Sequence, residues 1–180
     1  MRGFLRSGLL LGCSGLMVPG AAQAATQGTA GATSTGSVTV SATVPGRVQI
    51  SGLTDVAFGT VDPTSPASSA ENVCVWSNTS GKGYSVTASG NGTGNAFALS
   101  DGTNSLPYSV EWAGSSGQSS GTALTSGAAL AGLSSTATNP TCSAGPAATA
   151  SLIVKMTAAN LQAAVASAYT GTLTLVVAPQ

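Results

Sequence analysis

The sequence contains no histidine and very few charged residues, and both absences exclude functions. Histidine is the commonest general base in enzymes and a frequent zinc ligand. Only 6% of the residues are charged, whereas about 25% is typical of soluble domains. After residue 24 the only bases are Arg47, Lys82 and Lys155, and they face five acids. This small negative balance provides no basic patch for nucleic acid or for an anionic membrane.

No recognisable catalytic arrangement remains among the other residues. Glu71 and Glu111 could meet in space as a glycosidase pair, but solvated carboxylates explain them more simply. A Ser/Lys dyad would have to use Lys82 or Lys155, and no serine lies in a nucleophile elbow. We therefore expect a protein that is not an enzyme, with no catalytic residue, no metal site and no cofactor.

The first residues have the layout of a secretory signal peptide. Arg2 and Arg6 form a basic region, an apolar stretch follows from Leu9 to Val18, and small residues precede the Ala24–Ala25 bond. We predict a signal peptide over residues 1–24, cleaved between Ala24 and Ala25. The apolar stretch is too short, and too interrupted by glycine, for a permanent membrane helix. A lipoprotein box ending at Cys13 is a less favoured alternative.

Cysteine is equally scarce, with three residues in the chain. Cys13 belongs to the predicted signal peptide, so Cys74 and Cys142 remain as an even pair in an exported protein. Such a pair indicates one disulfide. It closes a loop of roughly 70 residues, which contributes about 4 kcal/mol in the chain-entropy model. A metal site is the weaker interpretation, because two thiols without histidine make a poor zinc site.

Apolar residues recur at every second position, which places them on one face of a strand. Turn-forming pairs such as Asn91–Gly92 and Asp101–Gly102 separate these stretches. A compact apolar run at 73–76 indicates a strand buried on both faces, and 48–50 and 56–58 are further extended pieces. Many short strands predict an all-β sandwich or barrel. The alternating positions are Val38, Val40, Ala42 and Val44; Tyr84, Val86 and Ala88; Leu106, Tyr108, Val110 and Trp112; Leu152, Val154 and Met156; and Leu173, Leu175 and Val177.

One segment breaks the strand pattern. Residues 158–168 are rich in alanine, with Leu161 and Val165 four positions apart and Thr157 available as an N-cap. This composition and spacing predict one short helix near 158–168, just before the last strand.

The mature chain divides into a leader and one domain. Residues 25–36 are polar and of low complexity, so we expect them to be flexible. The alternating strand from Val38 to Val44 follows and ends at Pro45–Gly46. We therefore assign 25–46 to a flexible leader with an N-terminal strand, and 47–180 to a single β-sandwich domain.

Four pieces of the chain, together with their order along it, resemble parts of chaperone–usher pilins. Residues 37–45 (SVTVSATVP), followed by the apolar 48–50, resemble the mature N-terminus of these pilins and are closest to the α-type CS1 and CFA/I-like fimbriae. Residues 106–114 (LPYSVEWAG) resemble a mid-chain strand of those subunits. The ending at 169–175 (YTGTLTL) is similar to the closing strand of pilins in general. Residues 56–62 (VAFGTVD) are similar to a motif of the spore-coat-U-like archaic pilins.

This resemblance implies an incomplete immunoglobulin-like β-sandwich that is completed by donor-strand exchange. In the family, a periplasmic chaperone first fills the groove of the incomplete domain. At the outer-membrane usher, the N-terminal strand of the next subunit replaces it. The residues implied as the donor strand are Val38, Val40, Ala42 and Val44.

The implied function is that of a structural subunit in a bacterial surface pilus or fimbria. Such a protein is exported through the periplasm to the cell surface and supports adhesion or biofilm formation. The implied partners are identical or related pilin subunits, the chaperone, the usher and a host or surface receptor, with no nucleic acid.

Two alternatives from other classes remain. The strand at 38–44 can be an ordinary first strand of a self-contained binding module, such as a surface lectin or tip adhesin. Trp76 or Trp112 would then stack on a sugar, although core packing is the simpler explanation for both. A coat or ice-interacting protein is the third candidate, but no regular threonine repeat supports ice binding.

Overall fold

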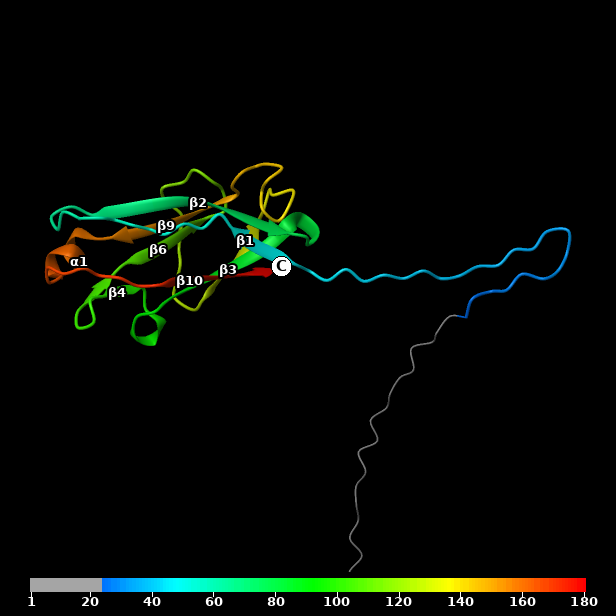
Figure 1. Ribbon diagram of the computed structural model, residues 1–180, viewed down its shortest axis with the longest axis horizontal. Helices are drawn as coiled ribbons and strands as arrows, with labels where there is room; N and C mark the ends of the chain where they lie inside the picture. Colours follow the sequence, from blue (N-terminus) through cyan, green and yellow to red (C-terminus); the bar gives the residue numbers. More distant parts are fainter. Residues whose placement is uncertain (1–23) are drawn as a thin grey trace, which may run out of the picture. The chain divides into compact units, whose positions relative to one another are not determined.

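The computed structural model describes residues 24–180, in two units that meet between Val44 and Pro45 (Figure 1). Most of the predicted signal peptide lies outside the described residues, and Ala24 and Ala25 are exposed. In the first unit, residues 24–44 form no named strand. Their only pairing is an isolated bridge in which Thr26 and Ser37 exchange two backbone hydrogen bonds of 2.9 Å. No helix within 24–180 is long and apolar enough to cross a membrane.

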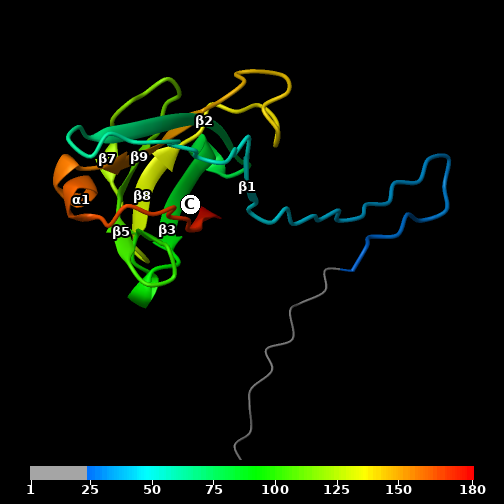
Figure 2. The same cartoon turned by 60° about the vertical axis from the view of Figure 1, so that its left-hand side comes forward.

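The second unit, Pro45–Gln180, is the all-β sandwich that the periodicity predicted. One sheet has the strand order β1-β2-β9-β6-β7 and the other β10-β3-β8, while β4 and β5 form a separate hairpin. Figure 2 shows β2 and β9 in one layer and β3 and β8 in the other. The strands are β1 Val48–Ser51, β2 Ala67–Ser77, β3 Gly83–Gly90, β4 Ala98–Ser100, β5 Ser105–Pro107, β6 Ser109–Ala113, β7 Thr122–Ala123, β8 Ala129–Ser134, β9 Ala150–Met156 and β10 Leu173–Pro179.

Alternation along the strands builds the core between the two sheets. Tyr84, Val86 and Ala88 of β3 are completely buried, and the alternating residues of β9 face them from the other sheet. Trp112 of β6 lies in the same core, where its indole N–H donates a hydrogen bond to the Tyr84 hydroxyl (3.2 Å). This hydrogen bond satisfies the indole N–H inside a core that is made mostly of aliphatic side chains.

Six strands follow the order of an immunoglobulin domain without its last strand. In the usual A-to-G lettering, β1, β2, β9 and β6 take positions A, B, E and D, and β3 and β10 take C and F. The short β7 and β8 are additional edge strands, beside β6 and β3. Strand G of a complete domain pairs with strand F. No described strand pairs with the second edge of β10, and β1 is likewise an edge strand. A Cβ atom added to Gly46 would lie 3.7 Å from the Pro179 side chain, so the two open edges come close at one end.

Two details of the secondary structure differ from the sequence expectations. The predicted helix exists, with the Thr157 hydroxyl capping it at Asn160 N–H (3.1 Å), but α1 covers only Ala158–Ala163. The chain beyond it turns back toward β10 instead of continuing as helix to 168. The extended piece predicted at 56–58 joins no sheet. Its half-buried Val56 and Phe58 pack against the main core all the same.

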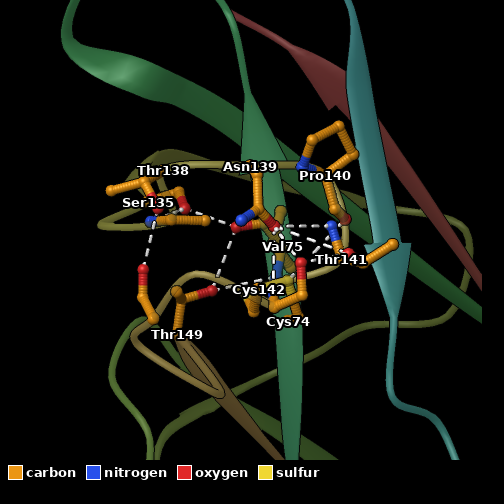
Figure 3. The surroundings of a disulfide bond; sticks show 12 residues. Cys74, Val75, Ser135, Thr138, Asn139, Pro140, Thr141, Cys142 and Thr149 are labelled. Atoms are coloured by element: carbon orange, nitrogen blue, oxygen red, sulfur yellow. Dashed lines mark hydrogen bonds between the residues drawn. A yellow bond between two sulfur atoms is a disulfide. The ribbon is translucent and has the colours of Figure 1, made fainter.

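The predicted disulfide joins Cys74 to Cys142, with their Cα atoms 6.0 Å apart (Figure 3). Cys74 lies on β2, opposite Ser51 of β1, and Cys142 lies in the loop between β8 and β9. Both sulfur-bearing side chains are buried. The bond therefore fastens the β8–β9 loop to the strand pair that begins the domain.

Hydroxyl side chains fasten the same loop at its two ends. The Thr149 hydroxyl accepts a hydrogen bond from Val75 N–H (2.9 Å) and donates one to Val75 C=O (3.0 Å). The Ser135 hydroxyl also donates to that carbonyl. Figure 3 shows these side chains converging on Val75. The register of β2 with β9 ends at Val73. Beyond it, these hydroxyl groups pair the N–H and C=O of Val75 in place of a neighbouring strand.

Candidate functional site, an open groove between two sheet edges

A groove of about 800 Å³ runs along the side of the sandwich where the two edges are open. One wall is the segment 53–61, which follows β1, and the other is the segment 167–175, which leads into β10. The floor is apolar and is made by Leu99, Leu106, Tyr108, Leu152, Val154 and Met156. We call this feature the groove. It exposes part of the hydrophobic core along a line between two sheet edges.

The first wall exists because β1 stops pairing with β2 after only four residues. Gly52 has a φ of +77°, a conformation that glycine adopts without steric cost. Beyond it, the backbone of residues 53–61 makes no hydrogen bond to any described residue. The Thr54 hydroxyl, which donates to the Glu71 carboxylate (2.5 Å), ties the segment to β2 by a side chain alone. The wall is thus an extended segment whose peptide groups are open to a partner.

The second wall has one side paired and one side open. β10 pairs with β3 over all seven of its residues. Just before it, Thr170 and Ser100 of β4 exchange two backbone hydrogen bonds, of 2.8 and 3.0 Å. Leu173 and Leu175 line the groove and are only half-buried. A strand laid in the groove would find both unpaired backbone groups and incompletely covered apolar side chains.

Asp55 is the only charged residue among the described residues that line the groove. Asp55 lies in the first wall, and Asp101 lies in the β4–β5 turn, next to Ser100. Hydrogen bonds from the Asn104 side chain, and then from the backbone N–H groups of Asn104 and Thr103, hold the pKa of Asp101 well below its ordinary value. Hydrogen bonds from Thr64 lower the pKa of Asp62 in the same way. Burial raises the pKa of Tyr108, so the floor of the groove stays uncharged.

The predicted donor-strand residues lie in the other unit. Val38, Val40 and Val44 are 74%, 87% and 80% exposed, and Ala42 is exposed as well. None of them belongs to a strand. Four alternating apolar side chains therefore have no packing partner among the described residues, and their assignment as a donor strand stays a prediction.

The alternative site residues are placed less favourably. Trp112 is 1% exposed and belongs to the core, and Trp76 is half-buried against the disulfide. Glu111 forms an ion pair with Lys155 (2.8 Å). The hydrogen bond from Lys155 is the main reason that the pKa of Glu111 is lowered, and one from Gly121 N–H adds to it. By strand alternation Glu111 points out of the sandwich, whereas Glu71 shares its face with the buried Val73. The two acids do not face one another. Residues 24–180 hold no cluster of three or more potential metal ligands.

The family resemblance implied an open groove, but the sequence pattern did not identify the residues that line it. The floor residues were predicted as ordinary core, because alternation identifies the inward face of a strand but not a missing neighbour. The wall at 53–61 was also missed, although the apolar 56–58 was predicted as an extended piece.

Comparison with known proteins gives little beyond these observations. No protein-family model matches the sequence, and no curated protein matches it either. Six chains of solved structures are similar. One belongs to a chaperone–tip adhesin complex described as vital for synergistic activation of CFA/I fimbriae biogenesis. It is 14% identical, with a TM-score of 0.49. The match covers 75% of the present chain and 41% of that one.

Proposed function

We propose that this protein is a structural subunit of a bacterial surface pilus, polymerising by donor-strand exchange. In this mechanism the Val38–Val44 segment of one subunit fills the groove of the next. The observation that carries the proposal is the combination of an open apolar groove between two sheet edges with an exposed, alternating apolar segment in the same chain.

The open edges argue for a partner strand. Sheet edges with unpaired N–H and C=O groups are a liability that soluble proteins normally cover or blunt. Here neither β10 nor the 53–61 wall carries lysine, and the only charged side chain among them is Asp55. The groove would therefore accept an added strand, which is the mode of recognition called β-augmentation.

The leader has the dimensions and chemistry of such a strand. Residues 38–44 number seven, as do the residues of β10. At about 3.3 Å per residue the two would run side by side over the same length. Burying three valines and one alanine contributes about 5 kcal/mol, before the backbone ladder adds to it. The serines and threonines between them would face solvent.

The arrangement predicts a filament rather than a closed oligomer. A strand from one copy entering a groove on another makes a head-to-tail contact, and such contacts propagate unless rotation closes a ring. The flexible residues before Val38 leave the strand free to reach a neighbour.

The remaining parts of the function follow from the same groove. Before assembly a periplasmic chaperone would cover it, and an outer-membrane usher would direct the exchange. The filament would stand on the cell surface, where it would support adhesion or biofilm formation, with a host or surface receptor as a further partner. The subunit would do no chemistry of its own.

Moving the leader tests the proposal most directly. Deleting residues 25–44 is expected to leave a subunit that folds beside its chaperone but cannot extend a filament. Appending the same residues after Gln180, through a short Gly/Ser linker, is expected to give a stable monomer, because β10 then pairs within its own chain. Electron microscopy of cells and size-exclusion chromatography of the purified chains measure the two effects.

The matched control is the same C-terminal extension with Val38, Val40 and Val44 changed to serine. It should fail to stabilise the monomer, since the extension then brings no apolar side chains. If the deletion variant still forms filaments, the donor strand lies elsewhere and the proposal fails.

A further inference from the structure

The few charges of the folded domain are separated along its length. Within residues 24–180 there are three bases and five acids, and only Lys155 and Glu111 form an ion pair. The other two bases lie at the end where the chain terminates. Arg47 immediately precedes β1, and Lys82 immediately precedes β3, whose first residue, Gly83, accepts a hydrogen bond from Gln180 N–H (3.1 Å).

Four acids are outside that ion pair, and one of them, Glu71 on β2, accepts a hydrogen bond from the Thr54 hydroxyl (2.5 Å). The other three lie outside the two main sheets. Asp62 is in the loop before β2, Asp101 is in the β4–β5 turn, and Asp55 is in the groove wall. Figure 1 shows β1 and the chain terminus at one end of the sandwich and β4 and α1 at the other. Each domain thus presents a basic end and an acidic end, a pattern that suits head-to-tail contact between identical copies.

The apolar residues alone do not decide which way a strand lies in the groove, but the position of Arg47 does. Arg47 is three residues beyond Val44. If the strand runs antiparallel to β10, with Val38 level with Pro179 and Val44 level with Leu173, Arg47 comes level with Thr170. If the strand runs parallel to β10, Arg47 of the donating subunit comes close to the basic end of the receiving subunit, which carries its own Arg47 and Lys82. Like charges would then meet.

Asp55 lies on the wall of the groove that faces the wall with Thr170. Gly46 and Pro179 begin the two walls at the same end, since a Cβ atom added to Gly46 would lie 3.7 Å from Pro179. Counted from these two residues, Asp55 is nine residues along one wall and Thr170 nine residues back along the other. Asp55 and Thr170 both line the groove. The Asp55 side chain is exposed and makes no hydrogen bond or ion pair with a described residue.

We propose that Arg47 of each subunit pairs with Asp55 of the subunit whose groove it enters, and that this contact sets the direction of the inserted strand. The inference rests on the proposed function. Asp101 follows Ser100, which is bridged to Thr170, so its charge adds to the negative potential near Thr170. Complementary charges of this kind raise the association rate and disfavour the wrong orientation.

Charge reversal with a swap tests the pairing. Arg47→Glu and, separately, Asp55→Lys are each expected to reduce surface filament by about tenfold, through slower strand exchange. The double variant Arg47→Glu with Asp55→Lys is expected to recover to within about twofold of the unaltered protein. Filament is measured by electron microscopy and by immunoblotting of material sheared from the cells.

Gln180→Glu is the matched control, because it adds a negative charge at the same end away from the proposed contact. Its carboxylate can still accept the hydrogen bond that Gly132 N–H donates to the Gln180 side chain (2.9 Å). This variant should polymerise normally. Normal filaments from Arg47→Glu, or a double variant no better than the single ones, would overturn the pairing while leaving strand exchange intact. Loss of strand exchange itself is detected separately by the leader deletion, so the two failures are distinguishable.

Discussion

Val40→Asp is expected to abolish filaments while leaving the domain folded. Val40 is 87% exposed and belongs to no strand of its own chain, so the carboxylate costs the folded subunit nothing. In a donor strand the same carboxylate would enter an apolar groove whose floor offers no cation. Burying an unpaired charge there costs several kcal/mol at every junction. A polymer needs every junction, so the loss would be complete at the level of visible filaments.

Thr39→Asp provides the matched control. It adds the same charge one residue earlier, on the opposite face of the strand, where the side chain stays in water. Electron microscopy should find filaments with Thr39→Asp and none with Val40→Asp, and chaperone-bound subunit should accumulate in both strains. If Val40→Asp instead prevents the subunit from folding beside its chaperone, the strand belongs to its own domain. The self-contained binding module then becomes the better interpretation.

Removing the disulfide is expected to have the second-largest effect. Changing Cys74 and Cys142 together to serine reopens a loop with a sequence separation of 68 residues. The chain-entropy model gives a loss of about 4 kcal/mol in the free energy of unfolding. That is a large part of the roughly 5–15 kcal/mol that stabilises a typical domain. The reduced loop keeps its hydroxyl contacts to Val75, so the domain should lose stability rather than its fold.

Urea unfolding of the monomer that carries the leader at its C-terminus measures this effect. Its groove is filled from within its own chain, so polymerisation does not interfere with the equilibrium. A reducing agent should lower the unfolding midpoint of the cysteine-containing chain and leave the double-serine chain unchanged. A difference below about 1 kcal/mol between the two chains would show that the bond contributes little and that the hydroxyl contacts hold the loop.

Much of the sandwich could be predicted because burial on one face imprints a period of two on the sequence. β6 and β10 show this most clearly, since their more buried residues alternate with more exposed ones. The disulfide followed from the two cysteines that remain after the predicted signal peptide. The start of α1 was predictable from Thr157, which caps it. Its end was not, because the alanines at 164 and 166 suit helix, whereas the backbone of Ala164 is already extended, with φ −75° and ψ 139°.

The groove was implied by the family resemblance, but its walls could not be predicted from the residues. The sequence of 53–61 alternates weakly and contains β-forming residues, so it is indistinguishable locally from a paired strand. In the structure the pairing of β1 with β2 ends at Ser51, and Gly52 follows with a positive φ. The alternation of Val38–Val44 is ambiguous in another way. It is the same whether the segment pairs within its own domain or enters the groove of another copy.

The attachment of the leader to the domain bears on how a filament would carry load. The Asn78 side chain accepts a hydrogen bond from Arg47 N–H (2.5 Å) and donates one to Pro45 C=O (3.0 Å). In a filament of the proposed kind, tension would enter each subunit at this clamp and pass along β1 into β2, close to the disulfide.

Tension would leave the subunit through the strand seated against β10. Ladder hydrogen bonds between antiparallel strands lie perpendicular to the strands, so a pull along the axis loads them together in shear and cannot open them one at a time. The buried core of each domain lies beside this line of force and not within it. Such a filament would resist breaking under flow even though its subunits are joined without a single covalent bond.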